Sequence, residues 1–355
     1  MAHIIITIAV RLCCVVQMLG DSPKSLTRFA CIALFIFLIA WAFPLPSIRG
    51  STPGGSAPSI TNAPHLGPST STMIAPNGEV LGPGCVYFVA NGASVVGNGT
   101  IINADGSKVT VGNIGSTCHE SASPDTYGTP PYVANGNDLL STSGNPIGTA
   151  SADWTVPTST PAPTCSSSGG QLLFYWNGLE VNGSVPGGEL LQPVLAHGYN
   201  GVNYGCYYYI QSWYLYMVGR NNYSITTVGT TVLSGDSLAG YMDYIGTHSG
   251  SCCWWYLSIT DSTYSTSESE FVRTSAYGGF SSFWWYFGGV LEAYSITSCA
   301  DFPNGSFGYT AFSSQTLSDT TGHSITPSWT TATTSGTPQC SFLVSTGSTF
   351  VDLSY

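Results

Sequence analysis

The sequence predicts an all-β protein, an antiparallel β-sandwich or concanavalin-like jelly roll that follows an N-terminal signal and a low-complexity pro-segment. Three observations support this prediction. Only 7% of the 355 residues are charged and 43% are apolar, with 42 Gly, 21 Tyr and 9 Trp, a composition that favours strands and turns over charge-rich disorder. Short β-like segments recur at roughly ten-residue spacing. After the leader, the sequence shows no sustained apolar stripe with a 3.6-residue period.

The first 46 residues are expected to form a leader. Residues 29–43 are an uncharged apolar run, preceded by Lys24 and Arg28 and followed by Pro44. A basic stretch before a short apolar run is typical of a secretory signal, and the run is shorter than the about 20 residues of a spanning helix. We therefore expect a secreted, extracellular protein with no stable membrane association after signal cleavage. An uncleaved signal anchor is the alternative.

Cysteine usage agrees with export. Eight cysteines follow the leader, and an even number suits a disulfide framework, although the spacing does not fix the pairs. No Cys-x-x-Cys pair and no His/Cys cluster with metal-ligand spacing occurs, so we expect no metal site and no cofactor. Glycosylation sequons begin at Asn98, Asn182, Asn222 and Asn304, as expected for a eukaryotic secreted glycoprotein.

The charge balance excludes several partners. Residues 50–355 contain 17 acidic side chains and only three basic ones, Lys108, Arg220 and Arg273. Such a body is repelled by the phosphates of nucleic acid and by anionic lipid headgroups. Its self-repulsion falls in acid, where carboxylates become protonated. We therefore expect no nucleic-acid partner. The chain is also expected to be a monomer.

Composition divides the rest of the chain near residue 145. Residues 50–82 are rich in Pro, Gly, Ser and Thr, and residues 84–113 contain short β-like pieces separated by Asn-Gly and Asp-Gly turns. We expect residues 47–145 to be a linker and pro-segment, and residues 146–355 to be the β-sandwich. Its candidate strands are residues 152–156, 171–180, 189–198, 206–218, 223–233, 237–246, 253–260, 288–296 and 305–312.

Familiar catalytic motifs are missing from the sequence. There is no Gly-x-Ser-x-Gly elbow and no Asp-Thr-Gly or Asp-Ser-Gly turn. Asp236 is interpreted as a turn residue before a strand. The histidines outside the first 46 residues are interpreted as surface or structural side chains: His65, His119, His197, His248 and His323.

Three polar residues stand out because they lie in apolar strand segments. Gln192 follows Glu-Leu-Leu, Glu292 follows Gly-Gly-Val-Leu, and Glu180 ends Trp-Asn-Gly-Leu. Carboxylates are seldom buried without a partner or a task. On alternation alone, each could instead lie on the solvent face of its strand.

Seven short motifs resemble, in order, those of the glutamic peptidases, or eqolisins (peptidase family G1/A4), which are secreted acid endopeptidases of fungi with a β-sandwich fold. They cover roughly residues 149–315. The motifs are Ser151-Ala-Asp-Trp-Thr-Val-Pro157, Trp176-Asn-Gly-Leu-Glu180, Leu190-Leu-Gln192, Ser212-Trp-Tyr214, Ser234-Gly-Asp-Ser-Leu238, Leu291-Glu292 and Ala300-Asp-Phe302.

The surroundings depart from the family pattern, so the chain resembles a divergent member. Pro193-Val194 replaces the Thr-Gly after the glutamine, and Leu215-Tyr216 replaces a Glu-Trp pair. Ala293 stands where the family has Trp, Ile296 replaces a second acidic residue, and Glu180 replaces Asp.

The resemblance implies a secreted acid endopeptidase that cleaves peptide bonds of a protein or peptide substrate without a metal or a nucleophilic side chain. It implies Glu292 as the general base that activates water and Gln192 as the oxyanion donor. By position, Glu180 would orient Gln192 or the water, and Trp176, Trp213 and Tyr214 would line the substrate cleft.

Three alternatives remain open. One is a non-catalytic β-sandwich relative that binds carbohydrate on the aromatics of residues 207–216, 254–255 and 284–285. Another is a structural cell-wall protein. A third is a glycosidase that uses Glu180 and Glu292 as its two carboxylates.

Overall fold

The computed structural model of the protein describes residues 66–96, 99–103, 105–110, 118, 134–139, 145–158, 171–181, 188–200, 206–218, 221–248, 251–274, 283–303, 308–333 and 340–355. The chain divides into two compact units, Met1–Ser56 and Ala57–Tyr355. The first unit, which contains the predicted signal, lies outside the described residues. No helix within the described ranges is long and apolar enough to cross a membrane.

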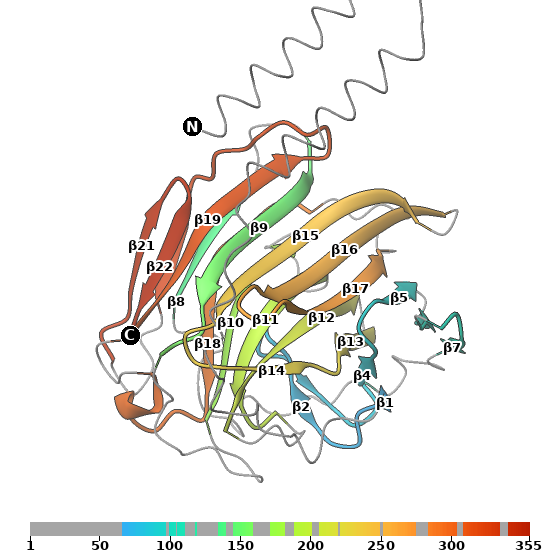
Figure 1. The fold of residues 1–355 in the computed structure, drawn as a ribbon, viewed down its shortest axis with the longest axis horizontal. Coiled ribbons are helices and arrows are strands. Elements are labelled where there is room, and N and C mark those ends of the chain that lie inside the picture. Colours follow the sequence, from blue (N-terminus) through green and yellow to red (C-terminus); the bar gives the residue numbers. More distant parts are fainter. Residues whose placement is uncertain are drawn as a thin grey trace, which may run out of the picture. The chain divides into compact units, whose positions relative to one another are not determined.

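The described part of the second unit is almost entirely β-structure (Figure 1), as the composition predicts; one short 3-10 helix, Cys299–Asp301, is described. Two large sheets form its layers. The first sheet runs in the spatial order β1 (Gly67–Pro68), β4 (Val86–Val89), β13 (Asn221–Thr227), β12 (Tyr208–Val218), β11 (Glu189–Gly198), β10 (Leu172–Glu180), β18 (Trp285–Tyr294), β8 (Ala134–Leu139) and β20 (Thr330–Thr333), with β14 (Thr230–Val232) beside β12.

The second sheet runs in the order β21 (Leu343–Gly347), β22 (Phe350–Ser354), β19 (Tyr309–Asp319), β9 (Ile147–Thr155), β15 (Ser237–His248), β16 (Ser251–Asp261), β17 (Thr266–Arg273), β5 (Ala93–Val96), β6 (Thr100–Ile102) and β7 (Lys108–Thr110). A separate two-stranded hairpin is formed by β2 (Met73–Ile74) and β3 (Val80–Leu81). Most neighbouring strands are antiparallel, as predicted.

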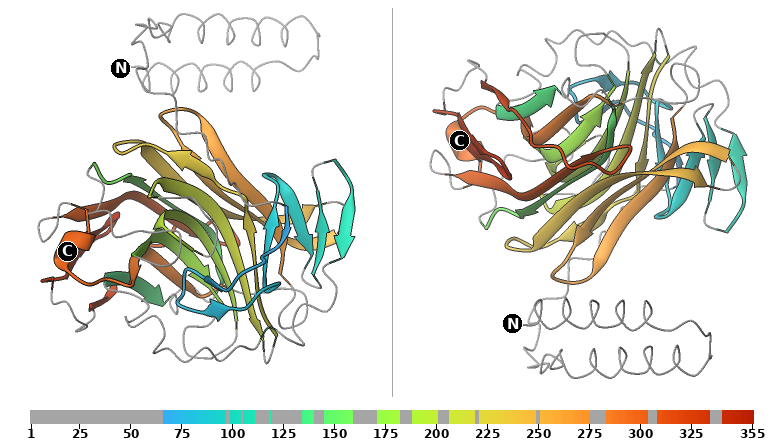
Figure 2. Two further views of the ribbon diagram at one scale, coloured as in Figure 1. Left: turned by 90° about the horizontal axis from the view of Figure 1, so that it is seen from below. Right: turned by 90° about the horizontal axis from the view of Figure 1, so that it is seen from above.

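The strands of residues 67–110 do not form a separate segment, although the composition placed a boundary at residue 146. Strand β4 pairs in parallel with β13, and β5 pairs in parallel with β17. Figure 2 shows these blue and cyan strands together along one edge of both sheets. Edge strands expose unpaired N–H and C=O groups, and these short segments satisfy them. The two parallel pairs also correct the purely antiparallel expectation.

The inner face of the first sheet packs on the second sheet. Its side chains come from alternate strand positions, since successive residues of a strand point to opposite faces. Tyr175, Leu195 and Leu291 contact the core that contains Trp154 and Phe312 of the second sheet, whose rings lie 5.1 Å apart. This apolar layer is the sandwich core that the sequence predicts.

The outer face of the first sheet is also buried, and the N-terminal segment covers it. One apolar cluster joins two groups of residues: Phe174, Trp176, Val194, Trp213 and Val290 from the sheet, and Met73, Ile74, Ala75, Leu81 and Phe88 from the segment. A sheet with both faces covered has near-continuous apolar strands. This explains why all ten residues of β11 are buried, polar ones included.

Disulfides tie the described chain at two places. Cys85 is bonded to Cys118, next to the covered outer face, and Cys299 is bonded to Cys340 in the inner core. Cys206 and Cys253 are also disulfide-bonded. The predicted disulfide framework is confirmed for these six cysteines.

Candidate active site

Gln192 and Glu292 lie on the same outer face of the first sheet. They belong to β11 and β18, which flank β10 on its two sides. Gln192 is paired with Trp213 across one ladder, and Glu292 is paired with Phe174 across another. Paired residues share a face, and both partners belong to the cluster under the N-terminal segment.

The register separates the two side chains along the sheet. Glu292 lies opposite Phe174, whereas the pairs Trp176–Val194 and Leu179–Leu191 place Gln192 opposite Gly178. Four positions along the strands and two strand spacings correspond to roughly 16 Å between the Cα atoms in a flat sheet. The ring of Trp176 lies on the face between them. The Gln192 amide and the Glu292 carboxyl group can contact the same peptide bond only if both side chains extend over the Trp176 ring.

Gln192 is fully buried, and its amide nitrogen already has a peptide carbonyl as partner. Nε2 donates a hydrogen bond to the backbone oxygen of Pro76, in the turn of the β2–β3 hairpin. Oε1 of Gln192 has no hydrogen-bond partner within the described residues. The amide therefore offers a donor to a carbonyl oxygen in a water-poor place.

Glu292 is 2% exposed, and its carboxyl group accepts a hydrogen bond of 3.2 Å from the Tyr294 hydroxyl at Oε2. Burial raises the pKa of Glu292 well above its ordinary value, while Tyr294 and the Trp176 indole lower it in part. In this closed arrangement burial therefore favours the neutral carboxyl group, and a neutral carboxyl group is a poor acceptor for a proton from water.

Three of the four other predicted site residues share this face. Trp176 packs edge-on against Phe287 at 5.4 Å, and Trp213 donates its indole N–H to Oε1 of Gln211 at 3.1 Å. Glu180 is partly buried at the end of β10, and desolvation raises its pKa.

Tyr214 lies on the opposite, inner face, which corrects its expected place in the cleft. It is paired with Leu191 and belongs to the core between the sheets. Its hydroxyl donates to Oε1 of the buried Glu189 at 2.7 Å. The resemblance identified the Ser-Trp-Tyr motif, but it did not say which face of the strand each residue lies on. Successive residues of a strand point to opposite faces, so Trp213 and Tyr214 lie on opposite sides of the sheet.

Sequence reasoning missed three residues that contact the site. Tyr294 lies two positions after Glu292 on the same strand, so strand alternation was a usable signal for it. Pro76 lies more than a hundred residues before Gln192. Asn200 accepts the Ile74 backbone N–H at its Oδ1 atom at 2.8 Å, in a buried position. No local pattern marks either of these two.

The other polar candidates that the structure describes are structural. Oδ2 of Asp236 accepts the Leu233 N–H within a turn, as predicted. His197 is buried and packs on Tyr208 at 4.7 Å, and desolvation lowers its pKa to about 4. Oδ2 of Asp301 accepts the backbone N–H groups of Thr297 and Ser298.

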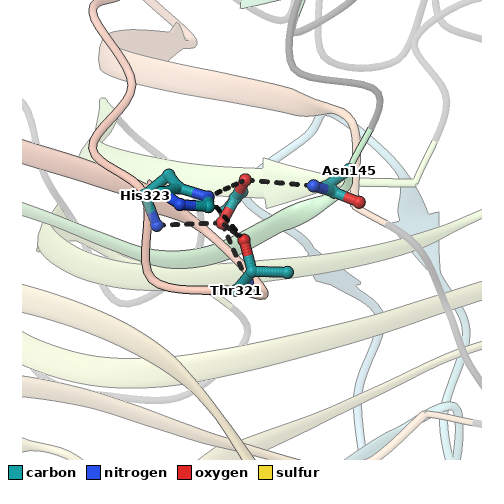
Figure 3. Close-up of polar contacts among 4 residues, drawn as sticks. Asn145, Thr321 and His323 are labelled. Atoms are coloured by element: carbon teal, nitrogen blue, oxygen red, sulfur yellow. Dashed lines mark hydrogen bonds and ion pairs between the residues drawn. The ribbon is translucent and has the colours of Figure 1, made fainter.

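Asp319 forms a polar cluster away from the first sheet, where β19 ends (Figure 3). Its carboxylate accepts hydrogen bonds from Thr321, from the His323 backbone and from Asn145, and His323 Nδ1 lies 3.6 Å from Oδ2. The Thr321 hydroxyl and the other donors lower the pKa of Asp319. The exposed His323 agrees with the surface reading of this residue.

Within the described residues, no group of three His, Cys, Asp or Glu side chains could hold a metal ion. His65 and His119 lie outside these residues, as do Asn98, Asn182 and Asn304 and the side chains of His248 and Asn222. The predictions for them stay predictions.

Comparison with solved structures finds glutamic peptidases. The chain is similar to SCP-B, an eqolisin solved with the tripeptide Ala-Ile-His, at 16% identity and a TM-score of 0.41, covering 63% of this chain and 98% of that one. Two structures of scytalidoglutamic peptidase with transition-state analogues give 17% and 14% identity and TM-scores of 0.41 and 0.42. They cover 63% and 64% of this chain, and 98% and 99% of theirs. No family model and no curated protein match.

Proposed function

We propose that the chain is a secreted acid endopeptidase in which Gln192 and Glu292 hydrolyse peptide bonds. The observation that carries the proposal is the hydrogen bond from Gln192 Nε2 to the carbonyl oxygen of Pro76. An oxyanion donor must reach a peptide carbonyl inside a site that excludes water, and this amide does so. The ordered motif resemblance of this chain supports the assignment.

The chemistry needs an ionised Glu292. Its carboxylate takes a proton from water as the water oxygen attacks the carbonyl carbon, and Gln192 donates to the oxygen that becomes negative. The C–N bond then breaks, and Glu292 returns the proton to the leaving amine. The amide does not titrate, so only Glu292 sets the pH dependence of this pair.

The closed arrangement is inactive by this argument. Glu292 is buried, which favours its neutral form, and the Gln192 amide already donates to the Pro76 oxygen. Opening the outer face hydrates Glu292 and moves its pKa toward the ordinary value of about 4.3. An acid medium then suits a group that must both take and give a proton.

The test is digestion of a denatured protein substrate at pH 4 by the purified full chain, with new amino termini counted. We expect activity that Glu292→Gln abolishes, because the amide cannot accept the proton of water. Equal activity in the Glu292→Gln variant contradicts the proposal.

A carbohydrate-binding role has one specific observation in its favour. Tyr241, Tyr256 and Phe271 form a row of half-buried rings across β15, β16 and β17, with centroid distances of 6.4 and 5.1 Å. Their register places them on the face of the second sheet away from the core. The aromatics first considered for this role mostly fail it, since Trp213, Trp254 and Trp255 are at most 1% exposed.

A further inference from the structure

The turn of the β2–β3 hairpin holds residues 73–75 against the outer face of the first sheet. The Ala75 N–H donates to the Glu79 oxygen at 2.9 Å, and the Gly78 N–H donates to the Ala75 oxygen at 3.0 Å. Met73, Ile74 and Ala75 are each at most 7% exposed. Their small and aliphatic side chains are thus packed on the sheet.

Two side-chain amides, one on β11 and one just after its end, bind the hairpin through its backbone. Gln192 donates to the Pro76 carbonyl, and Asn200 accepts the Ile74 N–H at 2.8 Å. The two backbone groups are only two residues apart. Amide side chains that bind backbone N–H and C=O groups recognise a peptide irrespective of its side chains.

A turn after β11 carries Asn200 to this place. Gly198 ends the strand with a φ of +109°, and a Cβ there would lie 2.1 Å from the Gln171 oxygen. Only glycine fits this position. Asn200 is 2% exposed, and its Nδ2 atom has no partner within the described residues. A buried amide NH₂ group without a partner can donate a hydrogen bond to the carbonyl oxygen of a bound peptide.

The hairpin cannot diffuse away when it leaves the face. The chain that follows it is held by the Cys85–Cys118 disulfide and by the parallel pairing of β4 with β13. The occupant of this face therefore stays at a high effective concentration.

We propose that the β2–β3 hairpin is a tethered pseudo-substrate, and that Asn200 binds the substrate backbone two residues before the carbonyl that Gln192 binds. The proposal rests on the proposed peptidase function. It assigns the substrate class as extended peptides with small or aliphatic side chains where Ile74 and Ala75 lie. The hairpin resists cleavage because Glu292 is fully covered in the closed arrangement, and burial favours its neutral form.

The experiment measures binding of the synthetic peptide of residues 73–81 to the full chain at pH 4. The peptide has no tryptophan, so a change in the fluorescence of the chain's nine tryptophans, which include Trp176 and Trp213 on this face, reports its binding. The Glu292→Gln background prevents turnover. Leu81→Asp places a carboxyl group in the buried hairpin contact and opens it, while Leu343→Asp makes the same change at an exposed residue of β21. Ala75→Asp is the second opening variant if Leu81→Asp does not fold.

We expect the opened variant to bind the peptide at least tenfold more tightly than the parent and the Leu343→Asp control. Adding Asn200→Ala should weaken that binding about 3- to 10-fold, the effect of one net hydrogen bond. Adding Asn200→Asp should weaken it less, because an oxygen acceptor remains. Equal binding by opened and closed chains overturns the pseudo-substrate, and an unaffected Asn200→Ala variant overturns the role of Asn200. If the opened chain binds the peptide but cleaves none with Glu292 intact, the peptidase function fails, and only the peptide-binding role of Gln192 and Asn200 stands.

Discussion

The two faces of the first sheet differ in what covers them. The inner face packs on the second sheet, whereas the outer face packs on a hairpin and strand from residues 73–88. Two large sheets that pack face to face form a permanent core, because side chains from both inner faces interdigitate along the whole length of the strands. The cover of the outer face is a short hairpin that packs on the sheet through Met73, Ile74 and Leu81 and has side-chain hydrogen bonds to two amides; its opening is part of the proposal. The difference locates the candidate site on the outer face.

Buried polar side chains on the outer face and in the interior between the sheets also differ in their hydrogen bonds. On the outer face, Gln192 and Glu292 each have a hydrogen-bond partner that a substrate or water could replace. In the interior between the sheets, Glu270 is fully buried, and neither of its oxygens has a hydrogen-bond partner within the described residues. A buried polar group without an exchangeable partner contributes to pH-dependent stability rather than to binding.

The largest expected effect tests the outer face. Gln192→Ala should lower the peptidase rate about 10²- to 10³-fold at pH 4, since it removes the only side-chain donor assigned to the oxyanion. The matched control is Gln315→Ala, which removes another buried amide, one on β19 that donates to the backbone oxygens of Gly288 in β18 and Phe312 in β19. Its rate per folded molecule should stay unchanged. Similar losses in both variants would show that Gln192 acts only in folding.

The next effect tests the interior. Burial raises the pKa of Glu270 well above its ordinary value. A raised folded pKa gives stability that is complete below the unfolded value of about 4.3 and is lost as the pH rises through the folded pKa. Glu270→Gln should therefore raise Tm at pH 8 by several degrees, at about 2–4 °C per kcal/mol, and leave Tm at pH 4 nearly unchanged. Asp153→Asn, at an exposed carboxylate, should show no such pH-dependent gain. A gain that is equal at both pH values would contradict the burial argument.

His197 should act in the opposite direction. Desolvation lowers its pKa from 6.5 to about 4, so the unfolded chain binds a proton first as the pH falls. The stability from this group is complete above about pH 6.5 and declines toward pH 4, by about 3 kcal/mol in all. His197→Phe should remove that slope in urea unfolding curves, and the exposed His323→Phe should keep it. An unchanged slope in His197→Phe would show that the ring is hydrated.

The smallest expected effect concerns Asp319, which lies on neither face of the first sheet. Asp319 holds the segment that enters β9 through Asn145, and its lowered pKa gives stability above about pH 4 that is lost as the pH falls through the folded value. Asp319→Asn should lower Tm slightly at pH 6 and by less at pH 2, because the pH of 2 is nearer to the lowered pKa of the folded state. Asp352→Asn, at a carboxylate elsewhere on the second sheet, is the control. An equal decrease at both pH values would point to lost packing instead of lost charge.

The sequence predicts those strands best whose apolar runs are bounded by turn residues. Residues 189–198 are found as β11 with the predicted bounds, and residues 171–180 differ from β10 by one residue. Strand β17 was missed because Glu268 and Glu270 alternate in it like solvent-facing residues, yet both side chains are buried. Local alternation cannot distinguish a covered polar residue from an exposed one.

The sequence predicted several residues of the candidate site, but not how the fold brings them together. Strand alternation assigns each of Gln192, Trp213 and Trp176 to one face of its own strand. The register of β10, β11 and β12 then places all three on the same face of the sheet. The contacts of Pro76 and Asn200 depend on chain segments more than a hundred residues apart, and no local propensity encodes such pairs. The parallel pairing of residues 86–96 with both sheets was hidden for the same reason.

The most direct measurement is the rate at which the opened full chain, Leu81→Asp, cleaves a quenched fluorescent peptide at pH 4, with and without Glu292→Gln. We predict cleavage by the opened chain that exceeds that of the closed parent and disappears with Glu292→Gln. Cleavage that survives the loss of the carboxyl group, or an opened chain that cleaves nothing, would contradict the assignment of Gln192 and Glu292 as a peptidase pair.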